Sequence, residues 1–215
     1  MGCKGDLMTD YAGITLKQYS DALASDAPTP GGGTAAAVAL SQGAALAIMV
    51  CNLTLGKERW EQGWGAAESC KNIAEPLLER GYQLAGEDAE AFDRVMAAFK
   101  MPKGTEEEVL DRKTAIRAET LNAAIVPMQT ARLSYELLAT LPSLASTGNA
   151  NAVTDVGVAG LLVSAACKGA LFNVEINLNS LPEDMAGELR GELDNLRMKC
   201  RDTAREIMHA VHDRM

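Results

Sequence analysis

Two aspartates stand where a carboxylate could carry out acid–base chemistry. Asp88 falls on one helical face with Phe92 and Val95, at spacings of four and three residues, so its side chain is expected to point inward. Asp155 stands at the start of a nearly uncharged stretch that runs to Leu178. An aspartate in a first helical turn also complements the helix dipole, worth about 1 kcal/mol, so a structural role stays open for both residues.

Few positive charges accompany these carboxylates in the apolar stretches. Lys57 is the first charged residue after segment 34–56, which has no Asp, Glu, Lys or Arg. A lysine at a helix end usually interacts with the helix dipole. Lys168 and Glu175 are the only charges within 156–178, and they lie two turns apart on one helical face. Because an unpaired buried charge is costly, they predict either a buried ion pair or a polar cavity.

A proline followed by three glycines precedes the first apolar stretch. These residues are Pro30, Gly31, Gly32 and Gly33. Backbone N–H groups at such a helix start are free to bind an anion or a carbonyl oxygen, although glycine-rich helix starts are common. His209 and His212 are the only histidines, and no cysteine or carboxylate completes a recognisable metal set with them. We therefore expect no metal site and no histidine-dependent catalytic triad.

The composition is that of a globular, acidic protein. The chain has 215 residues, 47% of them hydrophobic, 4% aromatic and 23% charged, and this length suits one domain. Its net charge of −9 at pH 7 argues against non-specific binding to nucleic acid or to an anionic membrane. No secretory signal is recognisable at the start, and the five cysteines are odd in number and widely spaced. We therefore expect a cytoplasmic protein with reduced thiols.

Helical periodicity runs along nearly the whole chain, without strand-like alternation. Pro102 and a capping-box pattern from Thr105 to Glu108 mark a sharp break between two helices. The expected helices are a short one capped by Thr15, then 34–55, 58–85, 87–101, 105–141 and 154–178, and a last one from Ser180. The prediction is an all-α, single-domain bundle of about seven helices over residues 15–215, after a tail of residues 1–14.

Two of the expected helices, 34–55 and 154–178, are nearly uncharged. The first is long enough to span a membrane, but polar residues such as Ser41, Gln42 and Asn52 interrupt it. An apolar helix of this kind otherwise lies at the centre of a bundle, so no membrane span is expected. A further packing seam, at spacings of three and four residues, consists of Ala124, Met128, Ala131, Tyr135 and Leu138.

Several motifs together resemble one protein family. They are APTPGGG at 27–33, MVCNLTLGK at 49–57, EDAEAF at 87–92, GNANAVTDVG at 148–157 and NVEINL at 173–178. In this order they are similar to the cyclodeaminase/cyclohydrolase family, which includes the cyclodeaminase half of formiminotransferase-cyclodeaminase and free-standing methenyltetrahydrofolate cyclohydrolases. The resemblance covers about residues 15–210, and Thr154 stands where the family pattern has Ser.

The resemblance implies an all-helical homodimer that acts on the one-carbon unit of a tetrahydrofolate, without a metal or other cofactor. Because one domain uses all 215 residues, we expect the free-standing enzyme, which hydrolyses 5,10-methenyltetrahydrofolate to 10-formyltetrahydrofolate. Two alternatives stay open. One is deamination of 5-formiminotetrahydrofolate with loss of ammonia, and the other is a non-catalytic folate-binding or scaffold protein.

The chemistry of this substrate gives the candidate residues expected roles. Water attacks a cationic carbon, a base takes a proton and N5 leaves, so Asp88 and Asp155 are expected as carboxylates and Lys57 as acid or electrostatic partner. The expected substrate-binding residues are Pro30, Gly31, Gly32, Gly33, Asn52, Asn149, Asn151 and, for the glutamate tail, Lys100, with Lys103 or Arg112 beside it. We expect the three catalytic candidates to line one cavity, close to a dimer core formed by the uncharged helices and the seam near Met128.

Overall fold

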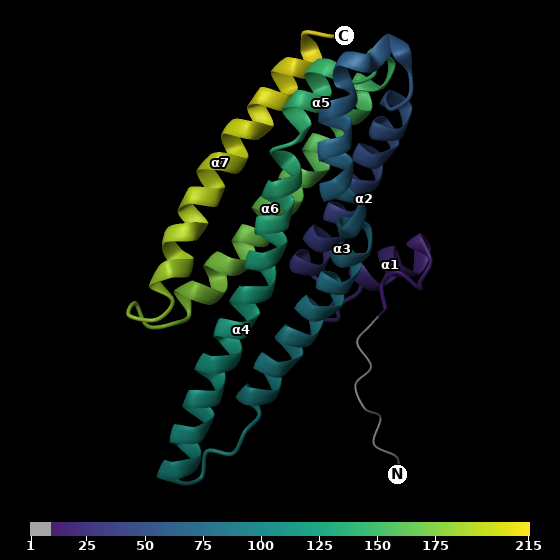
Figure 1. The fold of residues 1–215 in the computed structure, drawn as a ribbon. Helices are drawn as coiled ribbons and strands as arrows, with labels where there is room; N and C mark the ends of the chain where they lie inside the picture. Colours follow the sequence, from purple (N-terminus) through teal and green to yellow (C-terminus); the bar gives the residue numbers. More distant parts are fainter. Residues whose placement is uncertain (1–9) are drawn as a thin grey trace.

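The computed structural model describes residues 10–215 of the chain. These residues contain seven α-helices and two short 3-10 helices. Their order is α1 (Leu16–Leu23), α2 (Gly32–Thr54), a 3-10 helix (Glu58–Gly63), α3 (Trp64–Phe99), α4 (Glu106–Leu138), α5 (Leu141–Thr147), a 3-10 helix (Ala150–Ala152), α6 (Val153–Asn179) and α7 (Gly187–His212) (Figure 1). This part of the chain contains no strand, so the all-α prediction is confirmed. Residues 1–9 of the predicted tail lie outside the described residues.

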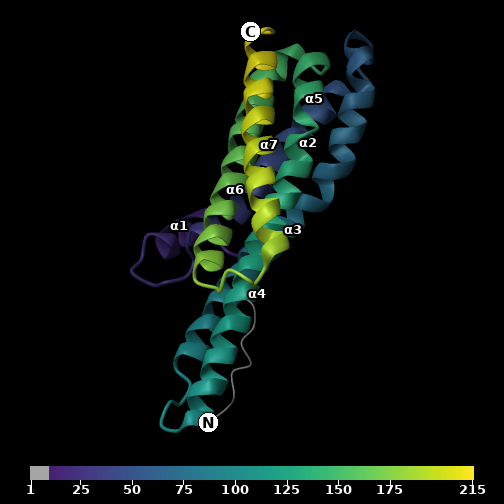
Figure 2. The same cartoon turned by 90° about the vertical axis from the view of Figure 1, so that its left-hand side faces the viewer.

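The helices α2 and α6 form the centre of the bundle. α2 packs against α3 and α6, α4 packs against α3 and α6, and α7 packs against α6. Glycine permits a close approach of α3 to α2, since a Cβ on Gly81 of α3 would lie only 2.8 Å from the carbonyl oxygen of Ala37 in α2. Figures 1 and 2 show that the hairpin of α3 and α4 projects beyond the ends of the other helices. The outer part of this hairpin therefore lacks the packing partners of its inner part.

The two nearly uncharged helices are core elements, as predicted. By length and composition alone, α2 and α6 could each cross a membrane. However, 56% of the most apolar window of each helix is buried within the bundle, and core helices of soluble proteins pass the same test. Their apolar composition therefore matches their central position in the fold.

The seam on α4 packs inside a single chain. Met128, Ala131 and Leu138 have no exposed surface, which confirms their predicted packing role. Because a second copy of the chain cannot reach side chains that are already enclosed, the expectation of a dimer core at Met128 is wrong.

Several element boundaries differ from the sequence prediction. α3 continues through Gly86, where the sequence predicts a break, because packing along α2 outweighs the ~1 kcal/mol cost of glycine inside a helix. Residues 58–63, predicted as α-helix, form a 3-10 helix, and α5 and the second 3-10 helix fill most of the stretch between the predicted helices 105–141 and 154–178. The last helix begins only at Gly187, because Ala186 adopts a left-handed φ of 60° that an α-helix cannot contain.

Candidate functional site

Asp88 of α3 lies against the N-terminus of α2. The N-cap of α2 is Gly31, which has no side chain to cap the helix. The hydroxyl of Thr34 in the first turn donates to Oδ2 of Asp88 at 3.3 Å. A Cβ on Gly33 would lie 2.7 Å from Cγ of Asp88, closer than real Cβ atoms approach other atoms. The glycine at position 33 therefore admits a carboxylate that caps α2 from another helix.

Burial makes Asp88 a better proton acceptor than an ordinary aspartate. Desolvation raises the pKa of its carboxyl, and the hydroxyl and N–H of Thr34 offset only part of that shift. No cation contributes to the shift. The ring of Tyr11, from the segment before α1, is buried nearby, where desolvation and then the charges of Asp88 and Asp93 raise the pKa of its phenol. A half-buried carboxylate without a cationic partner is suited to take a proton from a ligand.

A cavity of about 320 Å³ opens beside Asp88 where α2, α3, α4 and α6 meet. Phe92 and Val95 line it together with Asp88, which confirms that these three residues share one helical face. All three glycines of the run border the cavity, whereas Pro30 is not among its lining residues. The cavity thus combines one carboxylate, the backbone of a helix start and apolar side chains.

Two asparagines of α6 complete the polar lining of this cavity. The side-chain N–H of Asn173 donates to the carbonyl of Gly169 at 2.9 Å, and that of Asn177 donates to the carbonyl of Ala123 at 2.8 Å. Each of these bonds uses one of the two N–H groups of the amide, and the amide oxygen of each asparagine is left for a ligand. Together with the carboxylate, these oxygens suit a ring that presents N–H donors, as the amino-amide edge of a pterin does.

Five other predicted site residues meet at the opposite end of the bundle, where α2 ends and α6 begins. They are Asn52, Lys57, Asn149, Asn151 and Asp155. The side chain of Asn149 donates to the carbonyl of Leu53 and accepts from the N–H of Asn151, both at 2.9 Å. Its backbone N–H donates to the hydroxyl of Thr54 at 3.0 Å. Asn149 therefore ties the loop before α6 to the end of α2.

The two ends of the bundle are too far apart to form one site within a chain. Asn173, which lines the Asp88 cavity, follows Asp155 on α6 by 18 residues, or roughly 27 Å at the rise of an α-helix. Lys57 is exposed at the same end as Asp155. The expectation that Asp88, Lys57 and Asp155 line one cavity is therefore wrong for a single chain.

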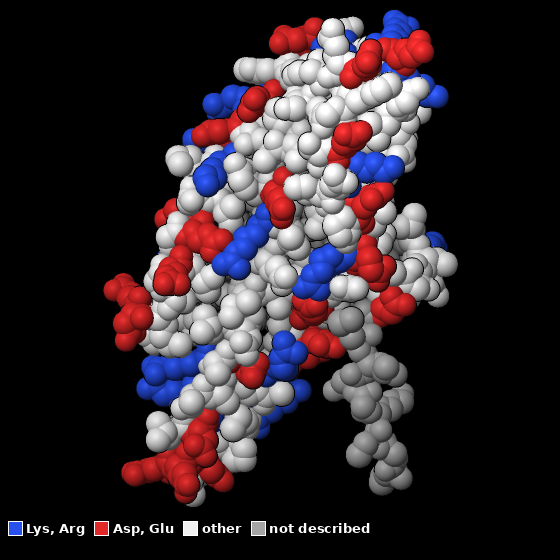
Figure 3. Space-filling view, in the orientation of Figure 1, with Lys and Arg blue, Asp and Glu red and all other residues white. Residues whose placement is uncertain are grey.

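Lys100, the predicted contact for an acidic tail, lies at the outer end of α3. It follows Asp88 by 12 residues, roughly 18 Å along the helix. Arg112 donates to the carbonyl of Phe99 at 3.0 Å, so its guanidinium already serves the hairpin itself. Figure 3 shows acidic side chains gathered at this tip, where the first turn of α4 carries three glutamates, 106–108. Lys103 and Lys113 lie at the same end, so its charges are mixed and the tail contact at Lys100 stays a prediction.

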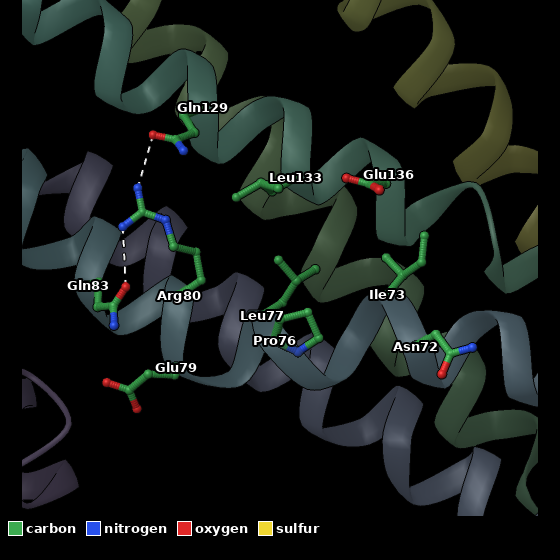
Figure 4. Close-up of a pocket in the computed structure, with 10 residues that line it drawn as sticks. All are labelled: Asn72, Ile73, Pro76, Leu77, Glu79, Arg80, Gln83, Gln129, Leu133 and Glu136. Carbon is green, nitrogen blue, oxygen red and sulfur yellow. Dashed lines mark hydrogen bonds between the residues drawn. The ribbon is translucent and has the colours of Figure 1, made fainter.

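A larger cavity, of about 510 Å³, lies between α3 and α4 away from the glycine run (Figure 4). Arg80 is the only cation among its lining residues. The guanidinium of Arg80 binds the carboxylate of Glu87 at 2.5 and 3.0 Å and the amide oxygen of Gln129 at 3.0 Å. The other charged residues of the lining, Glu79 and Glu136, are exposed. The charge of Arg80 is therefore balanced by Glu87, whereas no cation of the described residues pairs with Asp88.

Sequence reasoning missed two groups beside Asp88. Thr34 is an ordinary residue after the glycines, and no pattern indicates that its hydroxyl meets a carboxylate from α3. Tyr11 falls within the predicted tail, yet its ring is buried against Tyr19 at a centroid distance of 5.9 Å. The asparagines of α6 did carry a signal, because a spacing of four places both on one face of an apolar helix.

The protein is thus an all-helical bundle in which the carboxylate of Asp88, without a cationic partner, lies against the glycine-rich start of α2. The family model described as formiminotransferase-cyclodeaminase matches residues 15–195, and the chain belongs to this family. The family predicted from the sequence motifs is thereby confirmed.

Individual relatives cover most of the chain. A methenyltetrahydrofolate cyclohydrolase of Methylorubrum extorquens is 38% identical over 183 residues, which are 85% of this chain and 88% of that protein. The formimidoyltransferase-cyclodeaminase of Rattus norvegicus is 30% identical over 93% of this chain, which spans 37% of the rat protein. The crystal structure of formiminotetrahydrofolate cyclodeaminase from Thermotoga maritima superposes with a TM-score of 0.83 at 28% identity, over 94% of this chain and 98% of that one.

Proposed function

We propose that this protein hydrolyses 5,10-methenyltetrahydrofolate to 10-formyltetrahydrofolate, with Asp88 as the proton acceptor. The observation that carries the proposal is the unpaired carboxylate of raised pKa at the edge of a cavity. Similarity to the Methylorubrum extorquens cyclohydrolase over 88% of its length supports hydrolysis as the reaction. The reaction needs no metal or other cofactor, because the methenyl carbon is itself a cationic electrophile.

The proposed chemistry has three steps. Water adds to the methenyl carbon that bridges N5 and N10, and Asp88 takes a proton from the added water. The bond from this carbon to N5 then breaks, N5 is protonated, and the remaining hydroxyl proton leaves as the formyl group forms on N10. A carboxylate beside the cation stabilises it electrostatically, and its raised pKa favours the proton transfer. The amide oxygens of Asn173 and Asn177 hold the ring edge.

Deamination of 5-formiminotetrahydrofolate is the second candidate function. The observation that favours it is the likeness to the Thermotoga maritima cyclodeaminase, with a TM-score of 0.83. Both reactions pass through a tetrahedral carbon bonded to N5 and N10, so one site suits both.

Two assays on the purified protein distinguish these functions. Loss of the methenyl absorbance from methenyltetrahydrofolate, faster than the spontaneous reaction, is the result expected for a cyclohydrolase. Gain of that absorbance from formiminotetrahydrofolate, with release of ammonia, is the result expected for a cyclodeaminase. Folate binding without either change would contradict both and favour a non-catalytic binding or scaffold protein.

We further infer that the active protein is a homodimer joined along α2 and α6. These helices carry apolar side chains that the rest of the described chain leaves 38–67% exposed. They are Met49 and Leu53 on α2, and Val158, Leu161, Phe172 and Ile176 on α6. Phe172 is 67% exposed and Leu161 59%, although both lie on the most central helices of the bundle. Covering such a face with a second copy removes apolar surface from water, at about 25 cal/mol per Å².

A two-fold axis across the middle of α6 would bring the distant candidates together. Asp155 and Asn173 are equidistant in sequence from Ser164, and the neighbouring Ala165 is exposed and small enough for two copies of α6 to cross closely. In an isologous interface, antiparallel α6 helices place the first turn of one copy beside Asn173 of the other. Each site would then combine Asp88 from one chain with Asp155 and Lys57 from its partner.

Mixing two inactive variants tests this arrangement. Asp88→Asn and Asp155→Asn are each expected to lower activity by about 10²-fold or more as homodimers. In a co-expressed mixture, about half of the dimers contain one chain of each kind, and each of these has one intact site. About a quarter of the wild-type activity should therefore return. A mixture as inactive as its components, or a monomer in light scattering, would contradict the shared site.

A further inference from the structure

A single arginine side chain joins the end of α7 to the end of α5, which lie side by side (Figure 1). Arg214 follows the last residue of α7 by two positions. Its Nη1 donates to the carbonyl of Ala145 at 2.6 Å, and its Nη2 donates to the carbonyl of Gly148 at 2.9 Å. The last carbonyls of a helix have no partner within it, and a cation at that end also complements the helix dipole. Both carbonyls therefore find their donors on Arg214.

No carboxylate competes for this guanidinium. Among residues 10–215, none lies within salt-bridge distance of Arg214. The side chain is half-buried, and its guanidinium lies over the ring of Trp60, 6.0 Å from the ring centroid. An arginine over an aromatic face is attracted to it, which helps to keep the side chain in this direction. Arg214 is thus committed to the backbone of the segment that follows α5.

The segment after α5 is fixed on its other sides as well. The hydroxyl of Thr54, at the end of α2, accepts from the N–H of Asn149 at 3.0 Å. A Cβ on Gly63, at the end of the first 3-10 helix, would collide with the carbonyl of Thr147. Residues 147–149 therefore lie between α2, the first 3-10 helix and Arg214, and Arg214 supplies hydrogen bonds from the α7 side. Removing its side chain would release the segment on that side.

This segment carries predicted site residues. Asn149 and Asn151 belong to it, and Asp155 follows in the first turn of α6. Its backbone is hydrogen-bonded, since the N–H of Gly148 donates to the carbonyl of Leu144 and the N–H of Asn151 donates to the side chain of Asn149, both at 2.9 Å. A segment held in this way presents its side chains in one arrangement, as catalysis requires.

We propose that Arg214 is a positioning residue for the active site, which holds Asn149, Asn151 and the first turn of α6 in place. The proposal rests on the function and the shared site proposed above. The guanidinium donates to backbone carbonyls, so it acts through this segment and not on the substrate. Because a misplacement of about 1 Å can cost about 10²-fold in rate, the loss of both hydrogen bonds should affect the chemistry.

Arg214→Ala tests this role in the intact protein. It should lower kcat about tenfold, with a smaller change in KM and unchanged helical content. Amide hydrogens of residues 148–152 should exchange faster with deuterated solvent, whereas those of α4 should keep the wild-type rate. The matched control is Arg205→Ala, which removes the same charge from an exposed position on α7 and should match the wild type in both measurements. Wild-type kcat or wild-type exchange in Arg214→Ala would overturn the proposal.

Mixed dimers give a readout that a purely structural role would not produce. In the shared site, Arg214 serves the Asp155 half of its own chain, so Arg214→Ala should complement Asp88→Asn but not Asp155→Asn. The first mixture should reach about a quarter of the wild-type activity, and the second should stay below about a tenth. The Asp88→Asn, Asp155→Asn mixture is the positive control. If that control recovers activity and the two Arg214→Ala mixtures do not differ, Arg214 does not position the Asp155 half.

Deuterium exchange separates this role from the proposed reaction. In a protein without turnover, faster exchange confined to residues 148–152 of Arg214→Ala would support the role of Arg214 in holding the segment and refute only the reaction. Faster exchange along the whole chain would instead show general destabilisation and exclude a positioning role.

Discussion

Gly33 and Asp88 form one packing unit, in which the carboxylate fills the space that a side chain at position 33 would take. A Cβ on Gly33 would lie 2.7 Å from Cγ of Asp88. The first N–H groups of a helix have no partners within it, and Asp88 is placed at that end of α2. The glycine at position 33, in the first turn of α2, therefore also determines where the carboxylate of Asp88 lies.

Gly33→Ala should displace the carboxylate of Asp88 and so lower both stability and activity. We expect a loss of about 1–3 kcal/mol in the free energy of unfolding, the usual cost of overpacking, and at least about a tenfold loss of kcat. Urea unfolding and the methenyl assay measure the two effects. The control is Gly65→Ala on α3, where a Cβ meets open space and the protein should keep or gain stability. Wild-type activity in Gly33→Ala would show that the close approach is dispensable.

Asp88→Asn separates two roles of the carboxylate. If Asp88 accepts the proton, kcat should fall by about 10²- to 10⁴-fold with little change in KM. The wild-type rate should also rise with pH as the carboxyl ionises, with a midpoint above that of an ordinary aspartate, because burial raises its pKa. A raised KM with a nearly unchanged kcat would instead identify Asp88 as a residue that only binds the pterin edge.

The stability of the same variant should depend on pH in a defined direction. Because the pKa of Asp88 is higher in the folded state than in the unfolded chain, its ionisation costs stability as pH rises through the folded pKa. Asp88→Asn removes that cost. Its free energy of unfolding relative to wild type should therefore be higher near pH 8 than near pH 4. Asp93→Asn, exposed on the same helix, is the control, and an equal pH effect in both variants would contradict this origin.

Leu161→Arg should prevent the proposed dimer without unfolding the chain. The side chain is 59% exposed, so arginine fits the monomer, but in the interface it would be a desolvated charge. We expect a helical monomer in light scattering with at least about tenfold lower activity. Leu110→Arg on the hairpin, at a position 64% exposed, should remain dimeric. A fully active dimer of Leu161→Arg would exclude α6 from the interface.

Met128→Ala tests the enclosed seam. Met128 has no exposed surface, and truncating such a side chain costs about 2–5 kcal/mol of unfolding free energy. Met96→Ala, at a position 39% exposed, should cost less than about 1 kcal/mol. Similar losses in the two variants would contradict the assignment of the seam to the interior of one chain.

The fold was predictable because its signals are local. Thr105 forms the capping box that the sequence predicts, Thr15 caps α1 as predicted, and the two uncharged helices lie at the centre. The relation between Asp88 and Asp155 was not predictable in the same way. Spacing places each residue on its own helix, but only the antiparallel packing of α2 and α6 decides which helix ends meet.

Local propensity also failed where tertiary contacts decide. Gly86 breaks helices on average, yet it is buried inside α3, which packs along α2 on its way to the hairpin tip. Similarly, the motif around Asn149 suggested a ligand contact, while its hydrogen bonds to Leu53 and Thr54 join two segments distant in sequence. Neither partner of Asn149 is visible in the pattern that drew attention to it.

Because the hairpin of α3 and α4 projects from the bundle, local unfolding should cost less free energy at its tip than in the rest of the molecule. Its outer turns, near Phe99 and Val109, are exposed and lie beyond the ends of the remaining helices (Figure 2). Backbone amides there should exchange with deuterated solvent through local fraying, while those of α2 and α6 should exchange only when the whole chain unfolds. The tip is thus the place from which a protease would first enter this otherwise tightly closed protein.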